Sequence, residues 1–135
     1  MPNPNVLVVE DDEAVRRSLI DYLRLNRAID VDGARDGVEA WHRIVTTHYD
    51  VMILDLVMPK MSGVDLLDSL AALASDPTIH AIDRPPAVLV ITSYASAALP
   101  DDLIVQRCPS VIHGIFRKPL DIQKLAASVG KYLDM

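Results

Sequence analysis

Short apolar runs and amphipathic stretches alternate along the whole chain. Continuous runs of Val, Ile, Leu and Met predict buried strands, whereas a run that alternates with charged residues predicts a strand near a sheet edge. The edge candidate carries Asp30 and Asp32, and the last candidate is interrupted by His113 and Gly114. The five predicted strands cover Val6–Val9, Ile29–Gly33, Val51–Leu54, Ala87–Ile91 and Val111–Phe116.

Between these runs, apolar residues recur every three or four positions, which is the spacing of amphipathic helices. The stretch Glu13–Leu25 places Tyr22 and its other apolar residues on one face, and Arg16 and Arg17 on the solvated face. In the next helix Val38 and Trp41 belong to the apolar stripe. Helix starts are predicted at the capping box Asp36 to Glu39, at Ser62 and at Asp121, and Pro100 to Pro109 leaves room only for a short helix.

Strands that alternate with helices predict an α/β fold, in which a doubly wound parallel sheet is covered by helices on both faces. The pattern contains five strands and about five helices, without an internal repeat. A length of 135 residues is typical of one domain. We therefore expect a disordered N-terminal tail over residues 1–5 and a single domain over residues 6–135.

Charge and cysteine content restrict the classes of function. The chain has 19 acidic and 13 basic residues and a formal net charge of -6, which would repel a nucleic-acid backbone. The single cysteine, Cys108, cannot form an intramolecular disulfide, and this favours a reducing compartment. The apolar runs are far shorter than a membrane span. We expect a soluble, cytoplasmic protein without direct contact to nucleic acid or membrane.

Polar residues follow the predicted strands. In a doubly wound sheet the ligand site lies at the carboxyl ends of the strands, so these residues should converge. Clustered carboxylates repel one another, and a bound hard cation such as Mg2+ would offset the repulsion, because all the predicted ligands are oxygens. The residues are Glu10, Asp11 and Asp12 after the first strand, Asp55 after the third, Thr92 after the fourth and Lys118 after the fifth.

This set predicts phosphoryl chemistry. A carboxylate can attack phosphorus when a metal and a cation neutralise the transferred oxygens, and Asp55 is the candidate nucleophile. Lys118 would pair with one phosphoryl oxygen, and the Thr92 hydroxyl would donate a hydrogen bond to another. Glu10 and Asp11 would hold Mg2+. Taken singly, an acidic run after a strand is more often a helix cap, and the order of all these residues on different strands is what favours a site.

The sequence resembles the receiver domain of two-component response regulators, with the CheY-like variant of the flavodoxin-like fold, from Val6 to Leu133. The resemblance rests on motifs that occur in order along the chain. They are Val8-Val9-Glu10-Asp11, Ile53-Leu54-Asp55 with Met58-Pro59 and Gly63, Thr92 after Val90-Ile91, and Lys118-Pro119.

The resemblance implies the strand order 2-1-3-4-5 and a cis bond before Pro119. It implies that Asp55 takes a phosphoryl group from a histidine kinase or phosphotransfer protein, and that the metal ligands are Asp11, Asp55 and the carbonyl of Val57, with Glu10 acting through water. Phosphorylation would shift the conformation so that a separate downstream protein binds or a homodimer forms. The chain would then be a receiver without an output domain, which catalyses only its own phosphorylation and dephosphorylation and no other reaction.

The sequence departs from the family pattern in the output region. The family usually carries Tyr or Phe three residues before the lysine, where this chain has Ile115 followed by Phe116. The span from Thr92 to Lys118 is longer than the family norm, and we expect an unusual or mobile fourth-helix region within Ser96 to Ser110. The two positions that tune water access in the family are Val57 and Tyr94, whose size predicts slow hydrolysis of the acyl phosphate.

Other functions fit the residues less well. A phosphatase of the haloacid dehalogenase type needs a second aspartate two residues after Asp55, where this chain has Val57. A flavodoxin-like electron carrier needs a phosphate loop after the first strand, where Glu10 and Asp11 would repel the phosphate. An unphosphorylated interaction module with a receiver fold remains the alternative that phosphorylation tests would distinguish.

Overall fold

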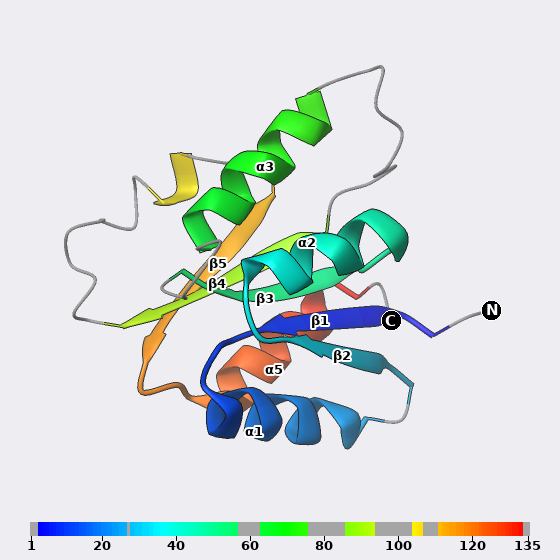
Figure 1. Ribbon diagram of the computed structural model, residues 1–135. Coiled ribbons are helices and arrows are strands. Elements are labelled where there is room, and N and C mark those ends of the chain that lie inside the picture. Colours follow the sequence, from blue (N-terminus) through cyan, green and yellow to red (C-terminus); the bar gives the residue numbers. More distant parts are fainter. Residues whose placement is uncertain are drawn as a thin grey trace.

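One parallel sheet of five strands organises the molecule, in the order β2-β1-β3-β4-β5 (Figure 1). The computed structural model describes residues 3–26, 28–56, 63–75, 86–93, 104–106 and 111–133. The predicted strand order is confirmed, and the neighbouring strands run parallel throughout. The strands are β1 (Asn5–Val9), β2 (Asp30–Ala34), β3 (Val51–Asp55), β4 (Ala87–Ser93) and β5 (Ile112–Lys118).

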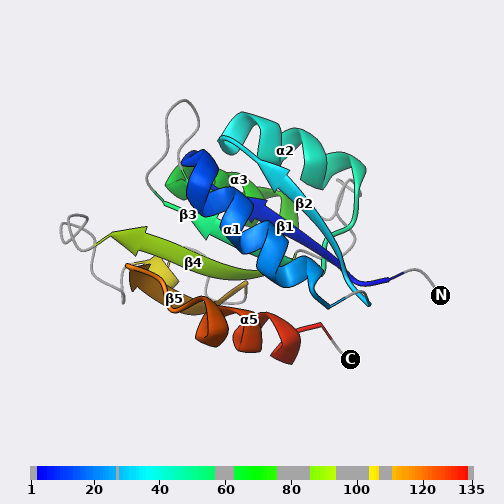
Figure 2. The ribbon, with the colours of Figure 1, turned by 90° about the horizontal axis from the view of Figure 1, so that it is seen from below.

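Helices cover both faces of the sheet, as the predicted α/β fold requires. Figure 1 shows α2 and α3 on one face and α1 and α5 on the other, and Figure 2 shows α1 and α5 from below. Within the described residues, these four helices and a helical stretch at 104–106 agree with the expected count of about five. The helices are α1 (Glu13–Arg24), α2 (Gly37–Thr46), α3 (Gly63–Ser75) and α5 (Ile122–Lys131).

The central strands bury side chains on both faces, because successive residues of a strand point to opposite sides. Leu7 and Val9 of β1 pack with the α2 and α3 side of the core. Val6 and Val8 pack with the α1 and α5 side. All four are fully buried, and burial of a side chain of this size stabilises the fold by about 1.5–3 kcal/mol.

Aspartates begin three of the helices. Asp12 accepts a hydrogen bond from the Val15 N–H at 3.2 Å, and Asp36 accepts one from the Glu39 N–H at 2.9 Å. Asp121 likewise accepts from the Lys124 N–H at 3.2 Å. These bonds confirm the caps predicted at Asp36 and Asp121, whereas the predicted cap at Ser62 lies outside the described residues.

Three details of the predicted elements are wrong. Asn5, predicted to belong to a disordered tail, lies in β1, and its N–H donates to Asp50 Oδ2 at 2.9 Å. Tyr22 and Val38, placed in apolar stripes, are 37% and 43% exposed. Each lies at the border of its apolar stripe.

Among the described residues, no helix is long and apolar enough to cross a membrane.

The interruption predicted in the last strand is a bulge. Ile112 of β5 pairs with Val88 and Gly114 pairs with Leu89, so His113 is an extra residue between two consecutive partners. Beyond the bulge the strand continues to Lys118, two residues further than the apolar run predicts. Its register carries Lys118 to the same edge of the sheet as Ser93.

Candidate functional site

The carboxyl ends of four strands bring the predicted polar residues together. Glu10 follows β1, Asp55 ends β3, Thr92 lies one residue before the end of β4, and Lys118 ends β5. Glu10 and Thr92 are fully buried and Asp55 is 3% exposed. Polar side chains of this kind are buried at a cost unless they find partners, so their convergence indicates a site.

The Lys118 ammonium joins the two buried carboxylates. Its Nζ lies 2.8 Å from Glu10 Oε1 and 3.2 Å from Asp55 Oδ2. Glu10 lies 108 positions and Asp55 lies 63 positions before Lys118 in the sequence, so the sheet topology creates the contact. Only 28% of the Lys118 side chain is exposed, which makes both ion pairs less screened than pairs at the surface.

A third carboxylate completes an acidic cluster. One oxygen from each of Glu10, Asp11 and Asp55 lies within 4.8 Å of the others. Asp11 is exposed, because the chain turns here before Asp12 caps α1. The cluster therefore combines two buried carboxylates with one exposed carboxylate.

Burial and neighbouring charges shift the pKa values of two groups in the cluster. Burial, together with the adjacent Asp55 carboxylate, raises the pKa of Glu10 to about 8. Burial by itself would lower the pKa of Lys118, but its hydrogen bond to Glu10 and the charges of Asp55 and Glu10 outweigh that effect and raise the pKa. One ammonium thus stays charged among three carboxylates and does not balance them.

Two buried oxygens have no hydrogen-bond partner, Glu10 Oε2 and Thr92 Oγ1. Such atoms are uncommon in folded proteins, and a bound ligand is a usual explanation. The oxygens of Glu10, Asp11 and Asp55 are the ligand type of a hard divalent cation, so these residues fit Mg2+. The Thr92 hydroxyl is available to donate to an acceptor that enters the site.

Gly63 brings α3 against the end of β3. A Cβ atom at this position would clash with the carbonyl oxygen of Asp55 and would lie 2.6 Å from Leu56 Cα. The Gly63 N–H also donates to the Leu56 carbonyl at 3.3 Å. Only glycine permits this approach, so Gly63 fixes the backbone that carries Asp55.

Arg16 is a site residue that the sequence interpretation missed. Its Nη1 donates to the main-chain oxygen of Glu10 at 2.9 Å, so its predicted place on a solvated helix face is wrong. Arg17, in contrast, is exposed as predicted and pairs with Glu13. A signal was present, because Arg16 shares a helical stripe with Ile20 and Leu23, which face the sheet.

The structure places some of the remaining predicted residues and leaves others outside the described part of the chain. Val57 and Tyr94 lie outside the described residues. The Lys118–Pro119 peptide bond is cis, the isomer that the resemblance implies. Ile115 and Phe116 pack into opposite sides of the core, Ile115 with the α2 and α3 side and Phe116 with the α1 and α5 side. Ile115 therefore occupies the place of the expected aromatic ring as a partly buried aliphatic residue.

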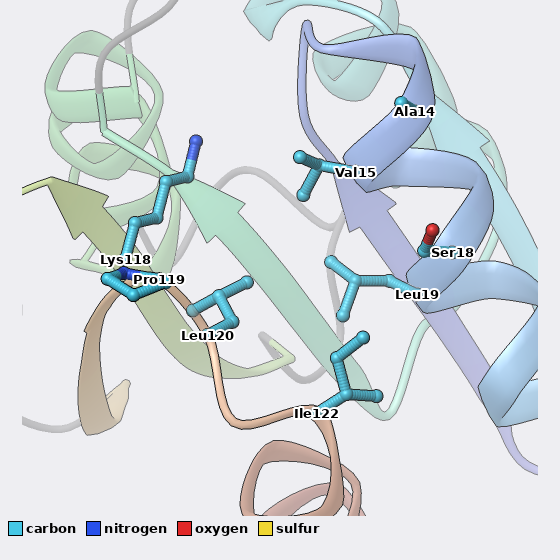
Figure 3. Close-up of a pocket in the computed structure, with 8 residues that line it drawn as sticks. All are labelled: Ala14, Val15, Ser18, Leu19, Lys118, Pro119, Leu120 and Ile122. Atoms are coloured by element: carbon cyan, nitrogen blue, oxygen red, sulfur yellow. The ribbon is translucent and has the colours of Figure 1, made fainter.

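An apolar cavity of about 370 Å³ opens beside Lys118, between α1 and the segment that connects β5 to α5. Figure 3 shows Leu120 and Ile122 facing Val15 and Leu19 across it. Lys118 thus belongs both to the acidic cluster and to the wall of this cavity. The surface next to the carboxylates is therefore apolar and recessed.

Comparisons with known proteins agree on one family. A sequence profile described as the response regulator receiver domain matches residues 6–130. The response regulator MprA of Mycobacterium avium (strain 104) is 39% identical over 71 residues, which are 53% of this chain and 31% of that protein. MprA of Mycobacterium ulcerans (strain Agy99) is 39% identical over the same length, 53% of this chain and 30% of that protein. The matched segment spans about a third of these relatives.

Solved structures give the same result over almost the whole chain. The Francisella response regulator 1452 receiver domain is 27% identical with a TM-score of 0.77, and 97% of each chain is covered. A response regulator receiver protein from Pseudomonas putida is 29% identical with a TM-score of 0.75, over 97% of this chain and 98% of that one. The chain therefore belongs to the response regulator receiver domain family, and it functions as a receiver in two-component signal transduction.

Proposed function

We propose that Asp55 is the phosphoacceptor of this receiver and that Glu10, Asp11 and Asp55 hold the Mg2+ ion its phosphorylation needs. The observation that carries the proposal is the position of the Asp55 carboxylate. It is buried, it lies within 4.8 Å of two other carboxylates, and it accepts from the Lys118 ammonium at 3.2 Å. A nucleophilic carboxylate beside both a fixed cation and a set of metal ligands suits phosphoryl transfer.

In the reaction, an Asp55 carboxylate oxygen attacks the phosphorus of a phosphohistidine on the donor protein. The new P–O bond forms as the P–N bond breaks, and the donor imidazole leaves with the electron pair. Mg2+, when bound, would neutralise negative charge on the transferred phosphoryl oxygens. The family ligand set adds the Val57 carbonyl as a further proposed ligand.

Lys118 and Thr92 would then contact the product. Lys118 Nζ already lies at the Asp55 carboxylate and can move to a phosphoryl oxygen as a point charge. The buried Thr92 hydroxyl, which has no hydrogen-bond partner, gains an acceptor. Both changes occur at the ends of β4 and β5, and this is where the conformational shift would begin.

The partners follow from the same chemistry. A histidine kinase or phosphotransfer protein must bring its phosphohistidine to Asp55. The apolar cavity beside Lys118 offers that protein a contact surface adjacent to the carboxylate. The signal would pass to an output domain or a separate downstream protein, or the phosphorylated chain would form a homodimer. Beyond its own phosphorylation and dephosphorylation, we propose no further reaction for the chain.

A mass experiment tests the proposal. The chain is incubated with Mg2+ and a small acyl phosphate donor, and its intact mass is compared with that of an Asp55→Asn variant. We expect one added phosphoryl group on the parent and none on the variant. Asp65→Asn is the matched control, because Asp65 is an exposed carboxylate in the first turn of α3. A parent chain without added mass would favour an unphosphorylated interaction module instead.

A further inference from the structure

We propose that Arg16 is a positioning residue for the cation site, because it holds the peptide group that joins Glu10 to Asp11. The inference rests on the proposed function, since it concerns the Mg2+ that Asp55 phosphorylation needs. In this role Arg16 would not itself contact the ion or Asp55. It sets the positions of two carboxylates that do.

The hydrogen bonds around Glu10 show how this works. Arg16 Nη1 donates to the Glu10 carbonyl oxygen at 2.9 Å, and that carbonyl belongs to the peptide bond between Glu10 and Asp11. On the other side, the Glu10 N–H donates to the Ala34 carbonyl at 3.1 Å. Both peptide groups of Glu10 are therefore fixed, one by β2 and one by α1. Bonds of this kind to groups behind the ligands orient a metal site.

The Arg16 side chain is itself held in place by the sheet. It is partly buried, and its Cδ atom lies 3.4 Å from the point where a Cβ atom of residue 33 would stand. The same point is 2.8 Å from Ile20 Cδ1. Because residue 33 is glycine, Ile20 can lie close to the backbone of β2, and the Arg16 stem lies at contact distance beside it. The Arg16 stem thus packs against β2 on its way to Glu10.

The neighbouring arginine gives a natural comparison. Arg17 carries the same charge one residue further along α1, but 72% of its side chain is exposed. Its ion pair is with Glu13 at 3.8 Å, on the solvated face. Arg17 therefore contributes charge near the site without the bond to the Glu10 carbonyl. A difference between the effects of replacing Arg16 and of replacing Arg17 therefore isolates the effect of that bond.

Two effects of Arg16 on Mg2+ binding oppose each other. Its positive charge repels the cation, and its hydrogen bond holds the ligands in place. Salt screens the repulsion over about 8 Å at physiological ionic strength, but it does not weaken a partly buried hydrogen bond to the same degree. We expect positioning to dominate, so that removal of Arg16 weakens Mg2+ binding although it removes a positive charge.

The experiment is an NMR titration of the full chain with MgCl2 at moderate salt, following the backbone amides of Asp11 and Asp12. Arg16→Met should raise the Mg2+ concentration at half-saturation about tenfold, the lower end of the range for groups that orient metal ligands. Arg17→Met should leave it within about twofold, since only long-range charge changes. Arg16→Lys, which keeps the charge and one donor, should recover part of the loss.

Urea unfolding separates positioning from a purely structural role. If Arg16→Met loses stability while its Mg2+ midpoint equals that of the parent, the proposal is wrong. Binding that is tighter than in the parent would also overturn it, because charge repulsion would then dominate. If Arg16→Met does not fold, Arg16→Lys provides the test, since it keeps the charge but loses the guanidinium fork, and its Mg2+ midpoint should lie above that of the parent. A parent chain that shows no Mg2+ response contradicts the proposed function itself, whereas normal parent binding with an unaffected Arg16→Met contradicts only the role of Arg16.

Discussion

Replacement of Glu10 by glutamine should stabilise the metal-free protein, and the gain should grow as the pH rises from 6 to 8. In the folded chain the pKa of Glu10 is raised from 4.5 to about 8, first by burial and then by its hydrogen bond with Asp55. The unfolded chain loses this proton near pH 4.5. Between these values the folded state binds more protons than the unfolded state, so the free energy of unfolding falls as the pH rises.

The structure sets the size of the effect. A single group with this difference lowers the free energy of unfolding by at most about 1.4 kcal/mol per pH unit. Glutamine does not titrate, and its oxygen can still accept from Lys118 Nζ, which lies 2.8 Å from Glu10 Oε1. Loss of the ion pair with Lys118 offsets part of the gain. We therefore expect the advantage of the variant to grow by about 2 kcal/mol from pH 6 to pH 8.

The free energy of unfolding of both proteins is measured in urea, with far-UV circular dichroism as the signal. The measurement is made at pH 6 and pH 8, with either EDTA or excess Mg2+. Mg2+ stabilises a folded state that binds it, so it should raise the stability of the parent more than that of Glu10→Gln and reduce the advantage of the variant. Glu13→Gln is the control, because it removes the same charge from a side chain that is 73% exposed. An equal difference between Glu10→Gln and the parent at both pH values would refute the reasoning.

Three further predictions concern other parts of the site. Thr92→Val should change the stability of the metal-free protein by no more than about 1 kcal/mol in urea, because the hydroxyl has no partner to lose, yet it should slow phosphorylation by a small donor. Gly63→Ala should lower the free energy of unfolding by about 1–3 kcal/mol, since the added methyl group meets the backbone of Asp55 and Leu56. Val57→Asn should shorten the lifetime of the phosphoryl group, measured as loss of the added mass with time, and an unchanged lifetime would remove Val57 from that role.

The fold was predictable because its signals are local. Apolar runs such as Val51–Leu54 are long enough for a strand and too short for a helix with caps, and the intervening stripes have helical spacing. The capping aspartates Asp36 and Asp121 accept from N–H donors three residues further along the chain, so spacing alone identifies them. The prediction of where β5 ends was less accurate. The pairing of β5 with β4, which also contains the bulge at His113, sets this end, and local sequence does not reveal that pairing.

The convergence of the site residues was predictable for a topological reason. Parallel strands end at the same edge of the sheet, so Asp55, Thr92 and Lys118 had to meet there once the strands were recognised. The contact of Arg16 with Glu10 was not predicted, because it depends on how α1 crosses the sheet. At that crossing Ile20 and Arg16 pack against Gly33, which lies on a strand distant in sequence. Local pattern therefore identifies the acidic cluster but not the contact that Arg16 makes with it.

The charges of the cluster explain why these features belong together. Glu10, Asp11 and Asp55 carry three negative charges when ionised, and within the part of the chain that the structure describes Lys118 supplies one positive charge to them. The metal-free protein reduces this negative charge by holding a proton on Glu10, whose pKa is raised first by burial and then by Asp55. A divalent cation would offset the same negative charge and displace that proton, because metal ligands bind in the ionised form. A phosphoryl group on Asp55 would replace the single negative charge of the carboxylate with about two, and these charges would draw on the ion, Lys118 and Thr92 together. Proton, cation and phosphoryl group are thus linked through one charge balance, and a residue that fixes the Glu10 peptide, as Arg16 does, influences all three.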